Sequence, residues 1–169
     1  QPTLDRLLIE PARRLPHMTF AVAGPQYPES IDWPKNVERI EHLPPTDHAD
    51  FYAASRFTLN VTRADMIAAG WSPSVRLFEA GACGTTIISD RWDGIEAVLE
   101  PGTEILLAEA SEEVTNLITG RDDMSHVGAA ARRRILGSHT SAHRAPELER
   151  YLQQAAQPHA DEVLIEAAE

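Results

Sequence analysis

The stretch that decides the fold reads GWSPSVRLFEAGACGTTIISD and spans residues 70–90. Its central part has apolar residues at helical spacing, and the β-branched run TTIIS at 85–89 is typical of a buried strand. Gly84 separates the two, and glycine commonly ends a helix because it adopts a left-handed backbone without a steric penalty. The stretch therefore predicts a loop, then a helix, then a buried strand.

The same alternation continues on both sides of this stretch. Further strands are expected at residues 18–25, 37–43, 57–61 and 103–108. Helices are expected at residues 3–15, 44–55, 92–100, 111–118, 122–137 and 145–156. Alternating strands and helices predict parallel strands joined by right-handed crossovers, so the expected fold class is α/β, a Rossmann-like doubly wound parallel sheet with flanking helices. Ligands of such sheets bind at the carboxyl ends of the strands.

Length, charge and cysteine content bound the class of protein. A chain of 169 residues suits one domain with a sizeable core, and its formal net charge of −11 argues against a nucleic-acid surface. The single cysteine, Cys83, excludes an intrachain disulfide and favours a reducing compartment. No apolar run is long enough to span a bilayer, and residues 1–16 do not resemble a signal peptide. These features predict a cytoplasmic protein without a transmembrane segment.

The polar start of the expected helix is suited to an anion. If the helix begins at Pro73, Ser72 is its N-cap, and the free amides of the first turn point toward the ligand-binding edge. A phosphate there would accept hydrogen bonds from these amides and would meet the positive end of the helix dipole. Gly70 would let the backbone approach closely, and Ser74 would add a hydroxyl.

Two arginines and one glutamate extend this interpretation. Arg63 and Arg76 flank the loop and can neutralise phosphate oxygens, and Glu79 is suited to accept hydrogen bonds from the hydroxyls of a ribose. A purely structural interpretation remains open: the serine is only a cap, Arg76 forms a surface ion pair, and Glu79 is solvated. Three apolar residues of this helix are expected in the core: Val75, Phe78 and Ala82.

Other familiar motifs of catalysis are missing from the sequence. It contains no G-x-G-x-x-G, no G-x-x-x-x-G-K-[ST] and no G-x-S-x-G. His139, His143 and Glu147 would share one face of a continuous helix and could bind a metal there. Pro146 and the turn residues at 138–141 argue against such a helix, so surface histidines and no metal site are expected.

Several segments together resemble a known family. RLFEAGACGTTIISD at 76–90, followed by WDGIEAVLEPGTEILLA at 92–108, resembles the C-terminal half of GT-B glycosyltransferases, and more narrowly the CgeB-like, spore-maturation-type group. The resemblance covers residues 3–155 and includes three further segments: FAVAGPQYP at 20–28, FYAASRFTLNVTRADM at 51–66 and SPSVRLFEA at 72–80. It implies a GT-B C-terminal domain at 1–156 and a tail at 157–169.

The resemblance also implies a function and a set of site residues. Such a domain binds a nucleoside diphosphate sugar without a metal, and the enzyme transfers the sugar, as a hexosyltransferase, to an acceptor. Glu79 matches the glutamate that holds the donor ribose, and residues 70–74 match the segment that meets the pyrophosphate. His42 and Leu43 lie where such proteins hold the base through backbone contacts. No catalytic residue is implied.

The departures from the family pattern keep alternatives open. The place of a second glutamate, which many retaining members carry, is occupied by Trp71. The first strand of the domain and an N-terminal acceptor domain are expected before Gln1, so this chain alone is expected not to turn over. One alternative is a non-catalytic nucleotide-sugar-binding or scaffold module of the same fold. Another is a different GT-B enzyme, such as an epimerase, for which no catalytic carboxylate can be assigned.

Overall fold

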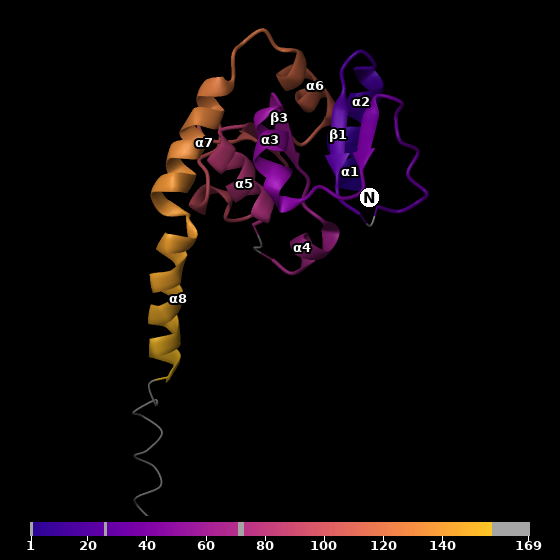
Figure 1. The fold of residues 1–169 in the computed structure, drawn as a ribbon. Coiled ribbons are helices and arrows are strands. Elements are labelled where there is room, and N and C mark those ends of the chain that lie inside the picture. Colours follow the sequence, from indigo (N-terminus) through magenta and orange to yellow (C-terminus); the bar gives the residue numbers. More distant parts are fainter. Residues whose placement is uncertain (1, 26, 71–72, 157–169) are drawn as a thin grey trace, which may run out of the picture.

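The computed structural model of the chain describes residues 2–25, 27–70 and 73–156, and its helices alternate with strands (Figure 1). The strands are β1 (Phe20–Ala23), β2 (Val37–Ile40), β3 (Phe57–Asn60), β4 (Thr86–Ser89) and β5 (Leu106–Leu107). The helices are α1 (Pro2–Leu4), α2 (Glu10–Arg14), α3 (His48–Ala53), α4 (Ala64–Ala68), α5 (Val75–Cys83), α6 (Ser111–Thr119), α7 (Ser125–Ser138) and α8 (Ser141–Ala156). A π-helical turn at Asp5–Ile9 joins α1 to α2, and 3₁₀ turns lie at Pro45–Asp47 and Ile95–Ala97.

All strand pairs are parallel, as the alternation predicts. The strands that the structure describes form two sheets, one of order β1-β2 and one of order β3-β4-β5. In the larger sheet β4 is central, and its four residues are all buried. A fully buried strand of β-branched residues is typical of a parallel sheet that is covered on both faces. The expected α/β class with parallel strands is therefore confirmed.

The two isoleucines of β4 show how the layers are arranged. Ile87 lies in a core cluster with residues of α3, α5 and α7, whereas Ile88 lies in a second cluster with residues of the N-terminal helical segment and α6. Both side chains are 0% exposed, and burying each contributes about 1.5–3 kcal/mol relative to exposure. Helices thus cover both faces of the larger sheet.

The N-terminal helical segment, residues 2–14, connects the two sheets. Leu7 packs in the cluster of Ile88, while neighbouring side chains of the segment pack with Val22 and Val37 of the smaller sheet. The end of the segment is held by Asn36, whose side-chain amide lies 3.0, 3.0 and 2.8 Å from the carbonyl oxygens of Ala12, Leu15 and Met18 and donates to them. These contacts tie the end of the helical segment to the residue that directly precedes β2.

The start of α5 differs from the expectation. The helix begins at Val75, and Ser74, with an extended backbone, is its N-cap and accepts a hydrogen bond from the amide of Arg76 at 3.4 Å. The expected start at Pro73 is therefore wrong, and Ser72 lies outside the described residues. Two serines before the helix both suit a cap, and only the backbone conformation distinguishes them.

The buried face of α5 also differs from the expectation. Val75 is 68% exposed, so its placement in the core is wrong, while Phe78 and Ala82 are partly buried against the core. The fully covered residues of the helix are Leu77, Ala80 and Gly81. Their spacing of three and one defines a helical face rotated away from Val75. Gly84 ends the helix with φ of 79°, as expected.

Helix α7 approaches the backbone after α5 closely. A Cβ atom on Gly128 would lie 2.1 Å from the carbonyl oxygen of Gly84 and 2.9 Å from the amide nitrogen of Thr86. Gly81 of α5 faces Ile135 of α7 in the same way, at 2.9 Å from its Cγ1. Glycines at these positions allow α7 to pack directly against α5 and β4 (Figure 1).

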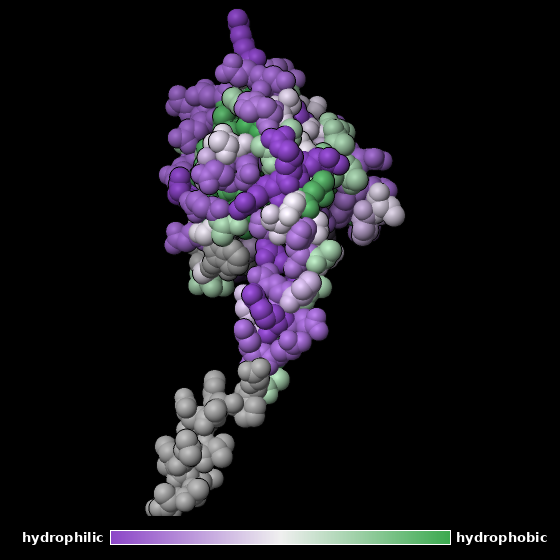
Figure 2. All heavy atoms as spheres, turned by 90° about the vertical axis from the view of Figure 1, so that its left-hand side faces the viewer, coloured by the Kyte–Doolittle hydropathy of each residue, from purple (hydrophilic) through white to green (hydrophobic). Residues whose placement is uncertain are grey.

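Helix α8 projects away from the rest of the domain (Figure 1). None of its residues is buried, and Pro146 lies inside it. Seen from the side of α7 and α8, the surface is mainly hydrophilic (Figure 2). His139 follows α7 and precedes α8, so it does not share a continuous helix with His143. Within the described ranges there is no group of three or more residues suited to a metal and no helix able to cross a bilayer.

Candidate functional site

Glu79 of α5 is held by two side chains of α3. The Tyr52 hydroxyl donates to Oε2 of Glu79 at 3.3 Å, and Nδ1 of His48 lies 3.5 Å from Oε1. The side chains of Glu79 and His48 are 37% and 33% exposed. Each carboxylate oxygen therefore has one protein partner, while the group remains accessible to a ligand.

The local structure of α3 explains why both side chains reach Glu79. His48 and Tyr52 are four residues apart, so they lie on one face of the helix. Their rings pack edge to face, with centroids 6.4 Å apart and an interplanar angle of 81°. The carbonyl oxygen of Tyr52 accepts a hydrogen bond of 2.7 Å from the Thr85 hydroxyl, which ties α3 to the segment between α5 and β4.

The surroundings of Tyr52 favour the protonated form of its phenol. Burial raises the pKa of Tyr52, the neighbouring Arg76 guanidinium lowers it, and the Glu79 carboxylate raises it again. A neutral phenol is the form that can donate to a carboxylate. The Tyr52 hydroxyl thus lies close enough to both Arg76 and Glu79 to be influenced by the charge of each.

The second ring nitrogen of His48 connects the site to the loop after β2. Nε2 of His48 lies 3.2 Å from the carbonyl oxygen of Leu43. Leu43 is half-buried, and its neighbour His42 is exposed. The structure therefore places Leu43, one of the residues expected to hold the base, in a chain of contacts that ends at Glu79.

Two other expected site residues lie in the loops before α4 and α5. Arg63 is exposed in the loop after β3, and Gly70 is exposed with φ of 89° and open space where a side chain would be. No hydrogen bond or ion pair in the part of the chain that the structure describes joins Arg63 or His42 to Glu79. The structure thus brings together Leu43, Arg76 and Glu79 around His48 and Tyr52. The Ser74 hydroxyl meets the backbone amide of Arg76 as the N-cap, and Arg63, Gly70 and His42 lie outside these contacts.

A buried polar network at the ends of β3 and β4 was not expected from the sequence. Asp90 is 3% exposed, and its Oδ1 accepts hydrogen bonds from the amide and the hydroxyl of Thr62 at 3.0 and 2.9 Å. Asn60 donates to the Ser89 hydroxyl at 2.9 Å, and that hydroxyl donates to the carbonyl oxygen of Asp90 at 2.8 Å. These bonds hold the loop that carries Arg63 against the end of β4.

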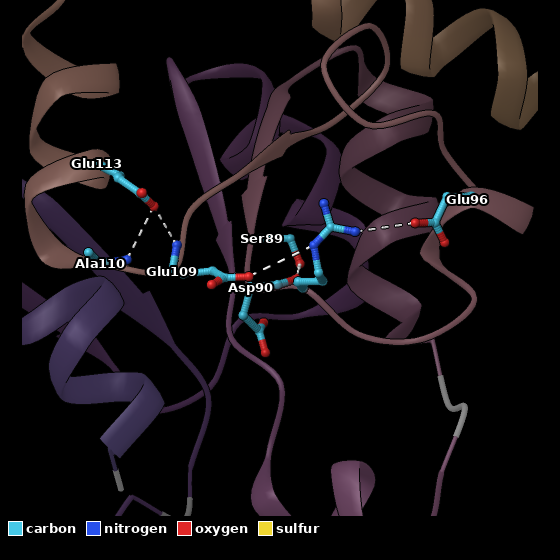
Figure 3. A network of polar contacts seen from close by, with 7 residues as sticks. Ser89, Asp90, Glu96, Glu109, Ala110 and Glu113 are labelled. Carbon is cyan, nitrogen blue, oxygen red and sulfur yellow. Dashed lines mark hydrogen bonds and ion pairs between the residues drawn. The ribbon is translucent and has the colours of Figure 1, made fainter.

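Charged side chains continue this edge of the sheet. Figure 3 shows Ser89 and Asp90 at the end of β4, between Glu109 and Glu96. Arg91 pairs with Glu96 at 3.4 Å and with Glu109 at 3.8 Å, in pairs whose side chains are half exposed or more. Such exposed pairs contribute little stability. Because Arg91 already pairs with two carboxylates, it is a poorer candidate than Arg76 for binding a ligand.

Sequence reasoning missed His48, Tyr52 and the network around Asp90. The spacing of His48 and Tyr52 on a short helix is visible in the sequence. Its meaning depends on Glu79, which lies on another helix and is brought near only by the tertiary fold. Asp90 directly follows an expected strand, which was the one available signal that it lies at the ligand-binding edge.

The fold and the site now define a class. Parallel strands, helices on both faces and a polar cluster at the carboxyl edge are the features of a ligand-binding α/β domain, and solved glycosyltransferases of the GT-B fold share this architecture. A family model described as glycosyl transferase-like matches residues 2–150, so the chain belongs to the glycosyl transferase-like family. The narrower assignment to the CgeB-like group stays a prediction.

Two solved structures illustrate the similarity. HepE from Anabaena, solved in complex with UDP-glucose, superimposes with a TM-score of 0.72 at 14% identity, covering 91% of this chain and 46% of HepE. AviGT4, a glycosyltransferase involved in avilamycin A biosynthesis, gives a TM-score of 0.58 at 20% identity, covering 91% of this chain and 48% of AviGT4. The chain thus spans about half of each. None of the curated proteins compared with it matches.

Proposed function

We propose that this chain is the donor-binding half of a glycosyltransferase that transfers a sugar from a nucleoside diphosphate sugar to an acceptor. The observation that carries the proposal is the accessible Glu79 carboxylate, held on both oxygens by His48 and Tyr52 beside Arg76. A carboxylate oriented in this way, at the ligand-binding edge of a glycosyl transferase-like fold, suits the two hydroxyls of a ribose.

The remaining groups suit the other parts of such a donor. Each Glu79 oxygen keeps an unused lone pair for a ribose hydroxyl. The carbonyl oxygen of Leu43 accepts from His48 and has a second lone pair for an N–H group of a base. Because HepE was solved with UDP-glucose, uridine is the first base to test.

Arg63, Arg76, the Ser74 hydroxyl and the backbone at Gly70 would steady the diphosphate. Positive charge placed where the leaving diphosphate gains negative charge stabilises the transition state. Two guanidinium groups would supply this charge, and we therefore expect no bound metal. His42 would contribute through its backbone, as the resemblance to GT-B enzymes implies.

We further propose that turnover requires a second domain for the acceptor and that this chain alone does not catalyse transfer. The chain spans about half of HepE and of AviGT4.

A second candidate function is a module that binds nucleotide sugars without catalysis. Trp71, at the place of a second glutamate in many retaining members, favours it. Under that function, donor binding is retained but no transfer or donor hydrolysis occurs with any acceptor domain.

Thermal unfolding with a panel of nucleoside diphosphates and their sugars tests the donor site. A ligand at a hundred times its Kd adds about 2.7 kcal/mol, and for a domain of this size each kcal/mol raises the midpoint by about 2–4 °C. The donor nucleotide is expected to raise the midpoint by several degrees. Glu79→Ala should remove this shift, whereas the exposed Glu112→Ala on α6 should keep it. A shift that survives Glu79→Ala would contradict the proposed site.

A further inference from the structure

His48 has an oxygen acceptor at each of its two ring nitrogens. Nδ1 faces the Glu79 carboxylate at 3.5 Å, and Nε2 faces the carbonyl oxygen of Leu43 at 3.2 Å. Neither oxygen can donate a proton, so each contact requires an N–H on the ring. A neutral imidazole carries one N–H and can keep only one of the two contacts, whereas an imidazolium keeps both.

The imidazole also links three separate parts of the fold. Leu43 follows β2, His48 begins α3, and Glu79 lies on α5. The ring is fixed between them by its edge-to-face packing on Tyr52, which binds the other oxygen of the same carboxylate. Removing the imidazole would free Oε1 of Glu79 to rotate and would leave the Leu43 carbonyl without this partner.

We propose that His48 is a positioning residue that couples recognition of the base to recognition of the ribose. When the ring carries an N–H on each nitrogen, Nε2 fixes the Leu43 carbonyl that faces the base and Nδ1 fixes the Glu79 carboxylate that faces the ribose. The protein would therefore recognise the base and the ribose of the donor through coupled contacts rather than through two independent ones. This inference rests on the proposed donor site and adds a residue to it that touches neither part of the donor.

Two amide substitutions separate the functions of the two nitrogens. In His48→Asn the side-chain amide nitrogen replaces Nδ1 and can still donate to Glu79, but nothing reaches Leu43. In His48→Gln the longer amide replaces Nε2 and can donate to Leu43, but Glu79 loses its donor. His48→Ala removes both contacts, and His17→Ala, at an exposed histidine near the start of β1, serves as the control.

The measurement is calorimetric binding of UDP, 2′-deoxy-UDP and CDP to the whole chain. The preference for UDP over 2′-deoxy-UDP reports on the ribose contact, and the preference for UDP over CDP reports on the base contact. We expect His48→Ala to lower both preferences, each by about fivefold, the value of one hydrogen bond. Asn should restore only the ribose preference, Gln should restore only the base preference, and His17→Ala should change neither.

The outcomes separate failure of this inference from failure of the proposed function. If Glu79→Ala lowers the ribose preference and His48→Ala changes neither preference, the positioning role is wrong. If the chain binds none of a wider set of nucleoside diphosphates, the donor function itself fails. The His48 contacts are then tested directly by ¹⁵N NMR of its imidazole. A ring whose Nδ1 resonance does not respond to Glu79→Gln would refute the link to Glu79, and a response would retain His48 as a partner of that carboxylate.

Discussion

Replacing Gly128 of α7 by alanine tests the packing that places α5 beside β4. The new Cβ would lie 2.1 Å from the Gly84 carbonyl oxygen, whereas ordinary contacts begin at 3.4 Å, so the two backbones must separate by 3.4 − 2.1 = 1.3 Å. The atoms that the new Cβ would meet, the Gly84 carbonyl oxygen and the Thr86 amide nitrogen, belong to the backbone and cannot rotate away as a flexible side chain could. The separation would loosen the packing of the buried Val127, Ala131 and Ile135 on the same helix.

The size of the effect follows from two opposing terms. Forcing extra volume into a packed interior costs about 1–3 kcal/mol, and we take the upper end because the clash is with backbone. Alanine in place of glycine favours a helix by about 1 kcal/mol. The expected net loss is about 2 kcal/mol, which lowers the midpoint of unfolding by about 4–8 °C in a domain of this size.

Gly137 on the same helix provides the matched control. A Cβ there would meet nothing within 4 Å, so Gly137→Ala should stabilise the protein by up to about 1 kcal/mol. Urea unfolding followed by circular dichroism would measure both variants, since a change of midpoint at constant slope is a change of stability. If Gly128→Ala is as stable as Gly137→Ala, the close approach of α7 to the 84–86 segment is refuted.

Two further predictions concern the site. Tyr52→Phe removes the hydroxyl that binds Glu79, so it should weaken binding of the donor nucleotide. Because burial is the main cause of the raised pKa of Tyr52, the variant should also lose less stability than the wild type as the pH rises above 10.0. An unchanged slope of stability against pH would contradict this. Asp90→Ala leaves two buried Thr62 donors without their acceptor and should lower the free energy of unfolding by about 2–4 kcal/mol. Asp90→Asn keeps an acceptor oxygen and should lower it less, and urea unfolding would measure both variants. Equal losses of stability in the two variants would show that the lost hydrogen bonds are not the cause.

The sign of the pH effect follows from the direction of the Tyr52 shift. The pKa of the phenol is raised in the folded state above the ordinary value of 10.0, so the folded chain holds this proton more tightly than the unfolded chain. The contribution of Tyr52 is fully present below the unfolded pKa and is lost as the pH rises through the folded pKa. Phenylalanine has no such proton, so this part of the alkaline loss should disappear in Tyr52→Phe.

Much of the fold could be predicted because its signals are local. The β-branched run that forms β4 and the glycine that ends α5 are readable from neighbouring residues, and the alternation of strands and helices restricts the pairing to parallel. Local signals alone did not fix the first and last residues of each helix and strand. Ser72 and Ser74 are equally good caps in the sequence, and the extended backbone of Ser74 and its bond to the Arg76 amide identify the cap only in the structure.

The candidate site was predicted only in part. Glu79 and Arg76 were found because they follow a loop at the ligand-binding edge and match a family pattern. The partners that hold Glu79 could not be found in this way. His48 and Tyr52 lie on the helix expected at 44–55, and nothing local in the sequence indicates which carboxylate that helix will face.

The sequence by itself determined the type and order of most elements, the parallel α/β class and the polar character of the loop before α5. These follow from periodicity and backbone preference, which act over a few residues. The sequence did not predict α4, and the helix expected at 92–100 is only a 3₁₀ turn at Ile95–Ala97. Only the tertiary structure decided which face of α5 is buried, that α7 touches the backbone at Gly84, and that His48 meets both Leu43 and Glu79. Such contacts depend on the packing of elements distant in sequence, where side-chain shape and burial outweigh local preference.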